Sequence, residues 1–163
     1  MLSACNNKAV DDLKGIYPAP TDVKMVSAED MGVEKLTKSS RIFTVGFTTE
    51  TGETLIMQML GGTYFLPSAS YTPSDYINSV NGNYIVATEQ HPDYGSYYIK
   101  KDGTRLSVKT GNFLAEKQGD TDYYSVSGAL WLSDETIIRV NGLVQLHYEQ
   151  NEPDEFPVLK SAQ

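Results

Sequence analysis

The side chains that most often carry chemistry are scarce in this chain, and their spacing matches no usual catalytic pattern. Cys5 is the only cysteine, and the polar stretch Asn6–Lys8 that follows it offers no base to activate the thiol. Nucleophilic catalysis needs such a base close to the nucleophile in a folded pocket. A single cysteine also excludes an intramolecular disulfide and a CxxC site for zinc or redox chemistry.

The two histidines and the acidic residues form no recognisable site either. His91 precedes a proline and His147 lies in an expected strand, without the HExxH or cysteine–histidine spacing of zinc sites. A glycosidase needs two carboxyl groups across a cleft, whereas most acidic residues here fall in turn sequences. Asp120 and Asp122 could join a calcium site, but no twelve-residue calcium loop surrounds them, and no GxSxG motif offers a serine nucleophile. We therefore expect no enzymatic activity, no catalytic residue, no metal site and no cofactor.

Aromatic side chains are more informative, because the chain has 11 tyrosines and a single tryptophan. Adjacent tyrosines at 97–98 and 123–124 must place one ring on each side of a strand, and a tyrosine ring with its polar hydroxyl suits a half-exposed position. Trp131 shares a strand face with the small residues Ser127 and Ala129, so its ring could stack on a sugar; alternatively, a loop covers it. The candidate ligand contacts are Trp131, Tyr94, Tyr97, Tyr98, Tyr123 and Tyr124.

Period-two alternation of apolar residues predicts that short β-strands position these side chains. Residues 41–50 alternate between apolar and small or polar side chains, and residues 53–60 repeat the alternation after a tight turn at 51–52. Two such segments around a turn are typical of a β-hairpin. A second hairpin is predicted around Asp102-Gly103, since glycine supplies the positive φ angle that such a turn needs.

The remaining turn signals predict roughly nine to ten strands. Residues 118–122 are expected to form the loop of a third hairpin and Asn141-Gly142 the turn of a last one. Residues 26–36 fit either a strand with a turn or a single helical turn. Turn signals about every ten residues are typical of an antiparallel sandwich or barrel. We expect a single all-β domain over residues 15–150, an antiparallel β-sandwich, with a lipocalin-like barrel as the alternative.

Length and charge limit the partners that the chain can have. A chain of 163 residues can bury one core of its own, and its net charge of -8 argues against nucleic acid as a partner. No run approaches the roughly 18 apolar residues that span a bilayer. Residues 1–14 are expected to form a polar tether and residues 151–163 a C-terminal tail.

The first residues, Leu2-Ser3-Ala4-Cys5, resemble the lipobox of bacterial lipoproteins, in which an apolar and two small residues precede an acylated cysteine. Together with the outline from "FTVGFTTETGETLIMQM" to "YYSVSGALWLSDETIIRVNGLVQLHY", the chain resembles Bacteroidetes outer-membrane lipoproteins of poorly defined function. The resemblance implies that Cys5 is lipidated and that the lipid is the chain's only contact with the membrane. The tether "NNKAVDDLKG" loosely resembles the export signal that sends such lipoproteins to the cell surface.

Three functions follow as expectations. The resemblance implies non-catalytic binding of a glycan or other small nutrient, or an accessory role in an uptake complex with an outer-membrane protein partner. The exposed face of a β-sheet suits a structural module that docks another protein. A lipocalin-like barrel would instead bind a small ligand in an interior lined by the apolar faces of its strands.

Overall fold

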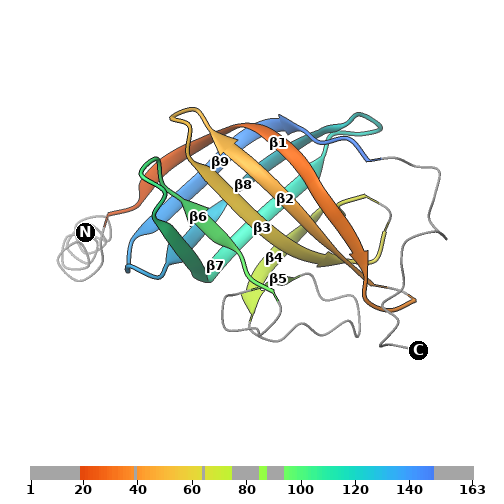
Figure 1. Cartoon of the computed structure of the whole chain (residues 1–163). Coiled ribbons are helices and arrows are strands. Elements are labelled where there is room, and N and C mark those ends of the chain that lie inside the picture. Colours follow the sequence, from red (N-terminus) through yellow and green to blue (C-terminus); the bar gives the residue numbers. More distant parts are fainter. Residues whose placement is uncertain (1–18, 39, 64, 75–84, 88–93, 149–163) are drawn as a thin grey trace, which may run out of the picture.

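The described part of the chain, residues 19–38, 40–63, 65–74, 85–87 and 94–148 of a computed structural model, is built of β-strands without a helix (Figure 1). The strands are β1 (Thr21–Lys35), β2 (Arg41–Thr49), β3 (Thr54–Gly61), β4 (Ala69–Ser74), β5 (Ile85–Ala87), β6 (Tyr97–Ile99), β7 (Arg105–Lys117), β8 (Tyr123–Leu132) and β9 (Ile137–Gln145). The expected tether with Cys5 and the expected tail lie outside the described residues.

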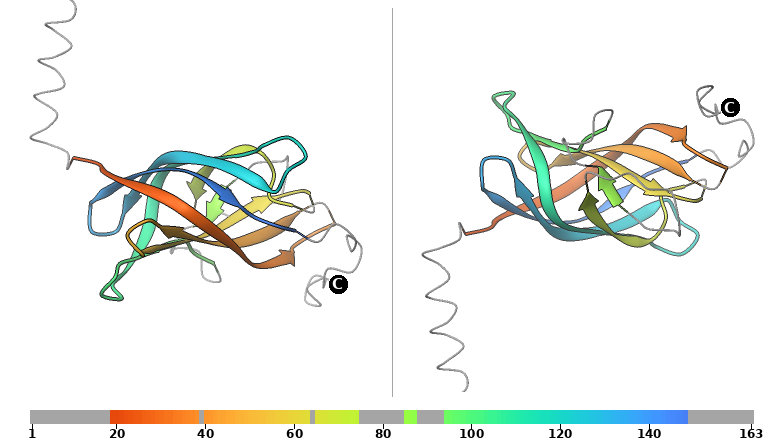
Figure 2. Two further views of the ribbon diagram at one scale, coloured as in Figure 1. Left: turned by 90° about the horizontal axis from the view of Figure 1, so that it is seen from above. Right: turned by 90° about the horizontal axis from the view of Figure 1, so that it is seen from below.

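The sheet closes on itself, so the expected β-sandwich is wrong and the alternative, a β-barrel, describes the molecule. Seven strands form the ring in the order β1, β2, β3, β6, β7, β8 and β9. Parallel pairing of β9 with β1 completes it. The two views of Figure 2 show these strands wrapping around a common interior. Period-two alternation predicts one buried face in a sandwich and in a barrel alike, and therefore does not distinguish them.

The wall between β3 and β7 is made of short pieces. At one end of the barrel β6 pairs with both strands. Toward the other end β4 pairs with β7, and β5 pairs with β3 through Met59 and Val86. β4 and β5 run parallel to each other, so five short or partial pairings replace one continuous ladder here.

Most predicted turns and strands are confirmed. Gly52 and Gly103 have φ angles of 89° and 88° in the turns at 51–52 and 102–103, and residues 118–122 connect β7 to β8. Of the two alternatives for residues 26–36, the strand is correct: residues 26–35 belong to β1, whose pairing with β2 shifts register beside Val26 and Met31.

The predicted turn at Asn141-Gly142 is wrong, because both residues lie inside β9. The turn before β9 lies instead at residues 133–136. A Cβ atom at Gly142 would lie only 2.3 Å from the carbonyl oxygen of Met25. Glycine is therefore needed at position 142 so that β1 can approach β9 closely.

Inward-facing side chains fill the barrel. Phe43, Val45 and Phe47 are fully buried, as their alternation predicts, and the rings of Phe47 and Phe113 lie 5.4 Å apart. Each fully buried side chain of this size contributes about 1.5–3 kcal/mol of hydrophobic stabilisation. Three methionines also face inward and are at most 1% exposed, which gives the interior flexible side chains that can adapt their shape: Met25, Met57 and Met59.

Candidate functional site

Residues 65–68, here called the Leu66 loop, lie between β3 and β4 at one end of the barrel, opposite the start of β1 (Figure 1). Leu66 is fully buried in the core. Its carbonyl oxygen accepts a hydrogen bond of 2.9 Å from the Tyr124 hydroxyl, and the carbonyl oxygen of Pro67 accepts one of 2.6 Å from the Tyr71 hydroxyl. The loop is thus held by side-chain hydroxyls that reach it from the interior.

Tyr148 is a third buried tyrosine at this end. The side chain is 6% exposed, and its ring meets that of Phe43 edge-on at 5.7 Å. Its hydroxyl has no hydrogen-bond partner within the described residues. Burial, followed by the nearby Asp30 and the two other tyrosines, raises the pKa of Tyr148 above its usual value. Since an unsatisfied buried hydroxyl costs about 1–3 kcal/mol, this group could accommodate an acceptor atom from a ligand.

A buried cation lies at the same end. Arg41, the first residue of β2, is 4% exposed and lies two positions before Phe43, on the same face of the strand. Its Nη1 atom donates a hydrogen bond of 3.4 Å to the carbonyl oxygen of Gly62. The tyrosine hydroxyls and the Arg41 guanidinium can donate hydrogen bonds to oxygen atoms at the end beside the Leu66 loop. The apolar interior of the barrel lies next to this end.

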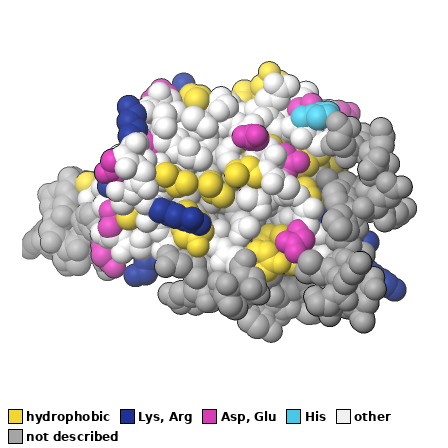
Figure 3. Space-filling model, viewed as in Figure 1, with side chains coloured by type: hydrophobic (Ala, Val, Ile, Leu, Met, Phe, Trp, Pro, Cys, Tyr) yellow, Lys and Arg dark blue, Asp and Glu magenta, His cyan; other side chains and the backbone are white. Residues whose placement is uncertain are grey.

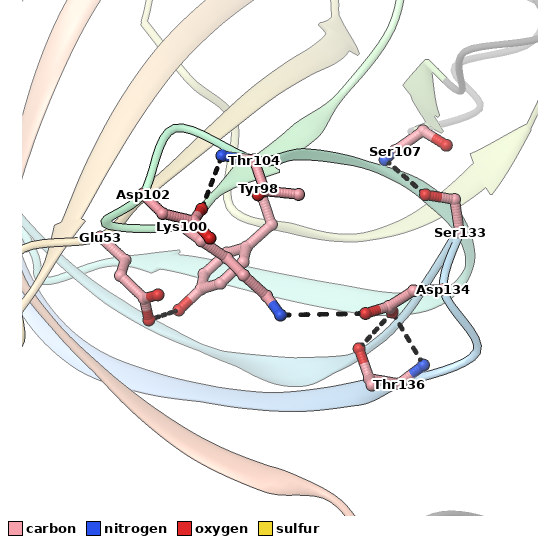
Figure 4. A network of polar contacts seen from close by, with 9 residues as sticks. All are labelled: Glu53, Tyr98, Lys100, Asp102, Thr104, Ser107, Ser133, Asp134 and Thr136. Atoms are coloured by element: carbon pink, nitrogen blue, oxygen red, sulfur yellow. Dashed lines mark hydrogen bonds and ion pairs between the residues drawn. The ribbon is translucent and has the colours of Figure 1, made fainter.

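A network of polar side chains holds the opposite end of the barrel (Figure 4). The Tyr98 hydroxyl donates a hydrogen bond of 2.6 Å to Glu53 Oε1; burial, then this bond, raises the pKa of Tyr98. Lys100 Nζ lies 4.0 Å from Asp134 Oδ2, and a hydrogen bond from the Thr136 hydroxyl is the main reason that the pKa of Asp134 is lowered. These contacts link the turns after β2, β6 and β8 at this end of the barrel.

The structure separates the predicted tyrosine contacts between the inside and the outside of the wall. Tyr98 and Tyr124 face inward and are 3% and 1% exposed, so neither can be reached from the outer surface. Tyr97 and Tyr123 face outward, Tyr123 being 44% exposed. One ring of each pair therefore faces the solvent side, as the alternation predicts.

A band of hydrophobic side chains crosses the middle of the face shown in Figure 3. Tyr97 is partly exposed on β6. It pairs with Ile56 on β3, and the Arg105 guanidinium lies 3.5 Å from the centre of its ring. Met31 is 52% exposed and lies over β2. Tyr94, just before β6, reaches β1 through a hydroxyl–carboxylate contact of 3.5 Å, so the structure brings Tyr94 and Tyr97 to one face.

Trp131 lies on a different part of the wall, in β8; its side chain is half-buried, and its indole nitrogen is shielded from solvent. It shares its face with Ser127 and Ala129, as predicted. These two small residues form part of an open depression of about 590 Å³ on the outer surface. Its lining comes from four strands and consists of Asp22, Asn112, Ser127, Gly128, Ala129, Arg139, Val140 and Asn141.

The sequence did not reveal the depression or the Leu66 loop as possible sites. The depression depends on which strands are neighbours, and the loop depends in part on the long-range contact from Tyr124 to Leu66. Pro67 indicated only that a strand ends. Trp131 beside two small residues was the one signal that pointed toward the depression.

Within the described ranges, no three His, Cys, Asp or Glu side chains lie close enough together to hold a metal ion. His147 Nδ1 lies 3.0 Å from Asp122 Oδ2 in an exposed pair, and His91 lies outside these ranges. Within the same ranges, no helix is long and apolar enough to cross a membrane. No family model, curated protein or solved structure matches the chain.

Proposed function

We propose that the protein is a non-catalytic barrel that binds a small amphiphilic ligand at the end beside the Leu66 loop. The observation that carries the proposal is the buried Tyr148 hydroxyl, which has no partner within the described residues and lies next to an apolar interior. A closed barrel of this size holds either its own side chains or one small ligand. Here Leu66 occupies the position that the apolar part of a ligand would take.

The attachment of the Leu66 loop supports exchange of Leu66 for a ligand. Leu66 reaches the core from a loop, so its departure leaves the hydrogen bonds between the strands intact. It breaks the bonds from Tyr124 and Tyr71, at about 1 kcal/mol each. Exposure of the leucine side chain adds about 2 kcal/mol. A total near 4 kcal/mol corresponds to an open state populated at about 0.1%, which a ligand can stabilise by binding to it.

The bound ligand would replace the contacts that Leu66 makes. Its oxygen atom would accept hydrogen bonds from Tyr124 and Tyr148, and its apolar part would pack on Phe43 and on the inward-facing methionines. Arg41 is buried on the same strand face as Phe43, and its positive charge would favour an acceptor oxygen with negative charge. Methionine side chains suit such a site because they adapt to irregular shapes.

Calorimetric titration with dodecanol and dodecanoate tests the site. Leu66→Ala should strengthen binding, because the space that the leucine leaves no longer has to be vacated. Leu132→Ala is the matched control, since Leu132 is equally buried but lies at the other end of β8; its affinity should equal that of the wild type. Tyr148→Phe should weaken binding of both probes about tenfold, the effect of one lost hydrogen bond. Absence of heat with both probes and all variants would exclude the proposal.

We further propose that lipidated Cys5 holds the protein at the outer membrane, facing the cell exterior. The direction of β1 supports this arrangement. The strand begins at the end where Tyr98 binds Glu53 (Figure 4), and it runs toward the end with the Leu66 loop. A tether before β1 would therefore leave the Leu66 end pointing away from the membrane. Metabolic labelling with a palmitate analogue should mark the protein in the cells that make it and should not mark Cys5→Ser. Equal labelling of the wild type and Cys5→Ser would contradict lipidation of Cys5.

A further inference from the structure

We propose that the depression on the outer wall of the barrel binds a neutral oligosaccharide, independently of any ligand in the interior. The depression is lined from β1, β7, β8 and β9, and its volume of about 590 Å³ lies in the range of small-molecule sites. Its floor includes Gly128 and Ala129, so no long side chain fills it.

The register of the strands places polar groups around this floor in two neighbouring rows. One row runs from Asn112 through Ala129 and Arg139 to Asp22. The next runs through Ser127 and Asn141. Carboxylate, guanidinium, amide and hydroxyl groups together offer donors and acceptors at close spacing. Neighbouring hydroxyl groups of a sugar ring present the same combination, each being a donor and an acceptor at once.

The charges in the depression favour a neutral ligand. Arg139 Nε lies 2.6 Å from Asp22 Oδ1, and this hydrogen bond to Asp22 is the main reason that the pKa of Arg139 is raised. The two opposite charges cancel within the site while their remaining atoms still face solvent, the side chains being 58% and 66% exposed. The Asn112 Oδ1 atom accepts a bond of 3.2 Å from the Ala129 N–H, which fixes this amide beside the floor.

Trp131 lies on the outward face of β8, two positions beyond Ala129, which lines the depression. A sugar unit extending past the floor would meet the accessible part of its ring, and the C–H groups of a sugar pack well on an aromatic surface. As the only tryptophan in the chain, it also provides a fluorescence signal that comes from one place. The site would thus combine polar contacts on the floor with an aromatic contact at the edge.

Calorimetry with neutral cello-, xylo-, malto- and manno-oligosaccharides, and with an acidic oligogalacturonate, tests the inference. We expect saturable binding of at least one neutral oligosaccharide with a shift in Trp131 emission. Asn141→Ala should weaken it at least tenfold. Gln145→Ala, an exposed outward position on the same strand, should change affinity less than twofold, and Leu66→Ala should leave it unchanged.

Several outcomes would overturn the inference. No binding of any neutral oligosaccharide excludes the site, and binding of oligogalacturonate alone contradicts its neutrality. Equal losses in Asn141→Ala and Gln145→Ala, with both variants shown to be folded by circular dichroism, would place the saccharide elsewhere. Binding without a change in Trp131 emission would contradict a contact between the sugar and Trp131. Failure of the dodecanol and dodecanoate titrations has no bearing on these results, because those probes address the interior.

Discussion

The Tyr124 hydroxyl donates a hydrogen bond to the carbonyl oxygen of Leu66, which lies 58 positions earlier in the chain. This contact joins β8 to the Leu66 loop, which is distant from β8 in the sequence, and it is buried in the core. With the similar bond from Tyr71 to Pro67, it keeps Leu66 in the interior. Closure of this end of the barrel thus depends on two side-chain hydroxyls as well as on pairing between strands.

Replacement of Tyr124 by phenylalanine should destabilise the protein by about 1–3 kcal/mol, because the buried carbonyl oxygen of Leu66 loses its donor. The measurement is the midpoint of urea unfolding, with an unchanged slope showing that the unfolded state is comparable. Tyr71→Phe should behave in the same way through Pro67. A loss well below this range in both variants would mean that water replaces the hydroxyl donors.

Replacement of Tyr148 by phenylalanine should have the opposite effect. Its hydroxyl is buried without a partner within the described residues, so removal of the oxygen should leave the unfolding free energy unchanged or raise it by up to about 1 kcal/mol. The same urea experiment measures it, with Tyr124→Phe as the matched comparison. A loss of stability similar to that of Tyr124→Phe would show that the hydroxyl has a partner and would remove the support for a ligand there.

Replacement of Gly128 by alanine should be far more damaging than the same change in a turn. Gly128 has a φ angle of 145°, and a Cβ there would lie 2.3 Å from the carbonyl oxygen of Asn112. Gly103 also has a positive φ angle, 88°, but a Cβ there would meet nothing within 4 Å. Gly103→Ala should therefore cost about 1 kcal/mol, whereas Gly128→Ala should cost at least about 3 kcal/mol because the backbones of β7 and β8 must separate. Equal losses in thermal unfolding would contradict the close approach.

Acid should weaken the end of the barrel that Asp134 helps to hold. The folded protein lowers the pKa of Asp134, chiefly through the hydrogen bond from Thr136. A lowered pKa stabilises the fold above the usual carboxyl pKa and loses this effect as the pH falls through the folded value. The unfolding free energy should therefore decrease below about pH 4. Thr136→Val should raise the Asp134 pKa, followed by NMR titration of its carboxyl carbon, and should reduce this decrease; an unmoved pKa would assign the shift to other groups.

Local sequence signals predicted the strands and most turns because both depend on neighbouring residues. The alternation of Phe43, Val45 and Phe47 and the glycine at 103 are of this kind. Closure of the barrel was not predictable in the same way. It depends on residues 21–25 pairing with residues 138–142, and the alternation in each segment fits a sandwich equally well.

The candidate sites were predicted only in part for a related reason. The outward position of Trp131 beside Ser127 and Ala129 follows from alternation along one strand. The walls of the depression come from other strands, and their order is set by the closed ring. The dipeptide Asn141-Gly142 is misleading because its glycine allows close approach to Met25, a demand that no local pattern distinguishes from a turn.

The parallel pairing of the first and last strands also has a mechanical consequence. β1 begins at one end of the barrel, β9 leads out at the other, and five positions pair between them. A pull on the chain before β1 against a load attached after β9 would slide these strands past each other, so their hydrogen bonds would have to rupture together rather than one at a time. A protein anchored before β1 and pulled after β9 would resist the tension through the pairing of these two strands.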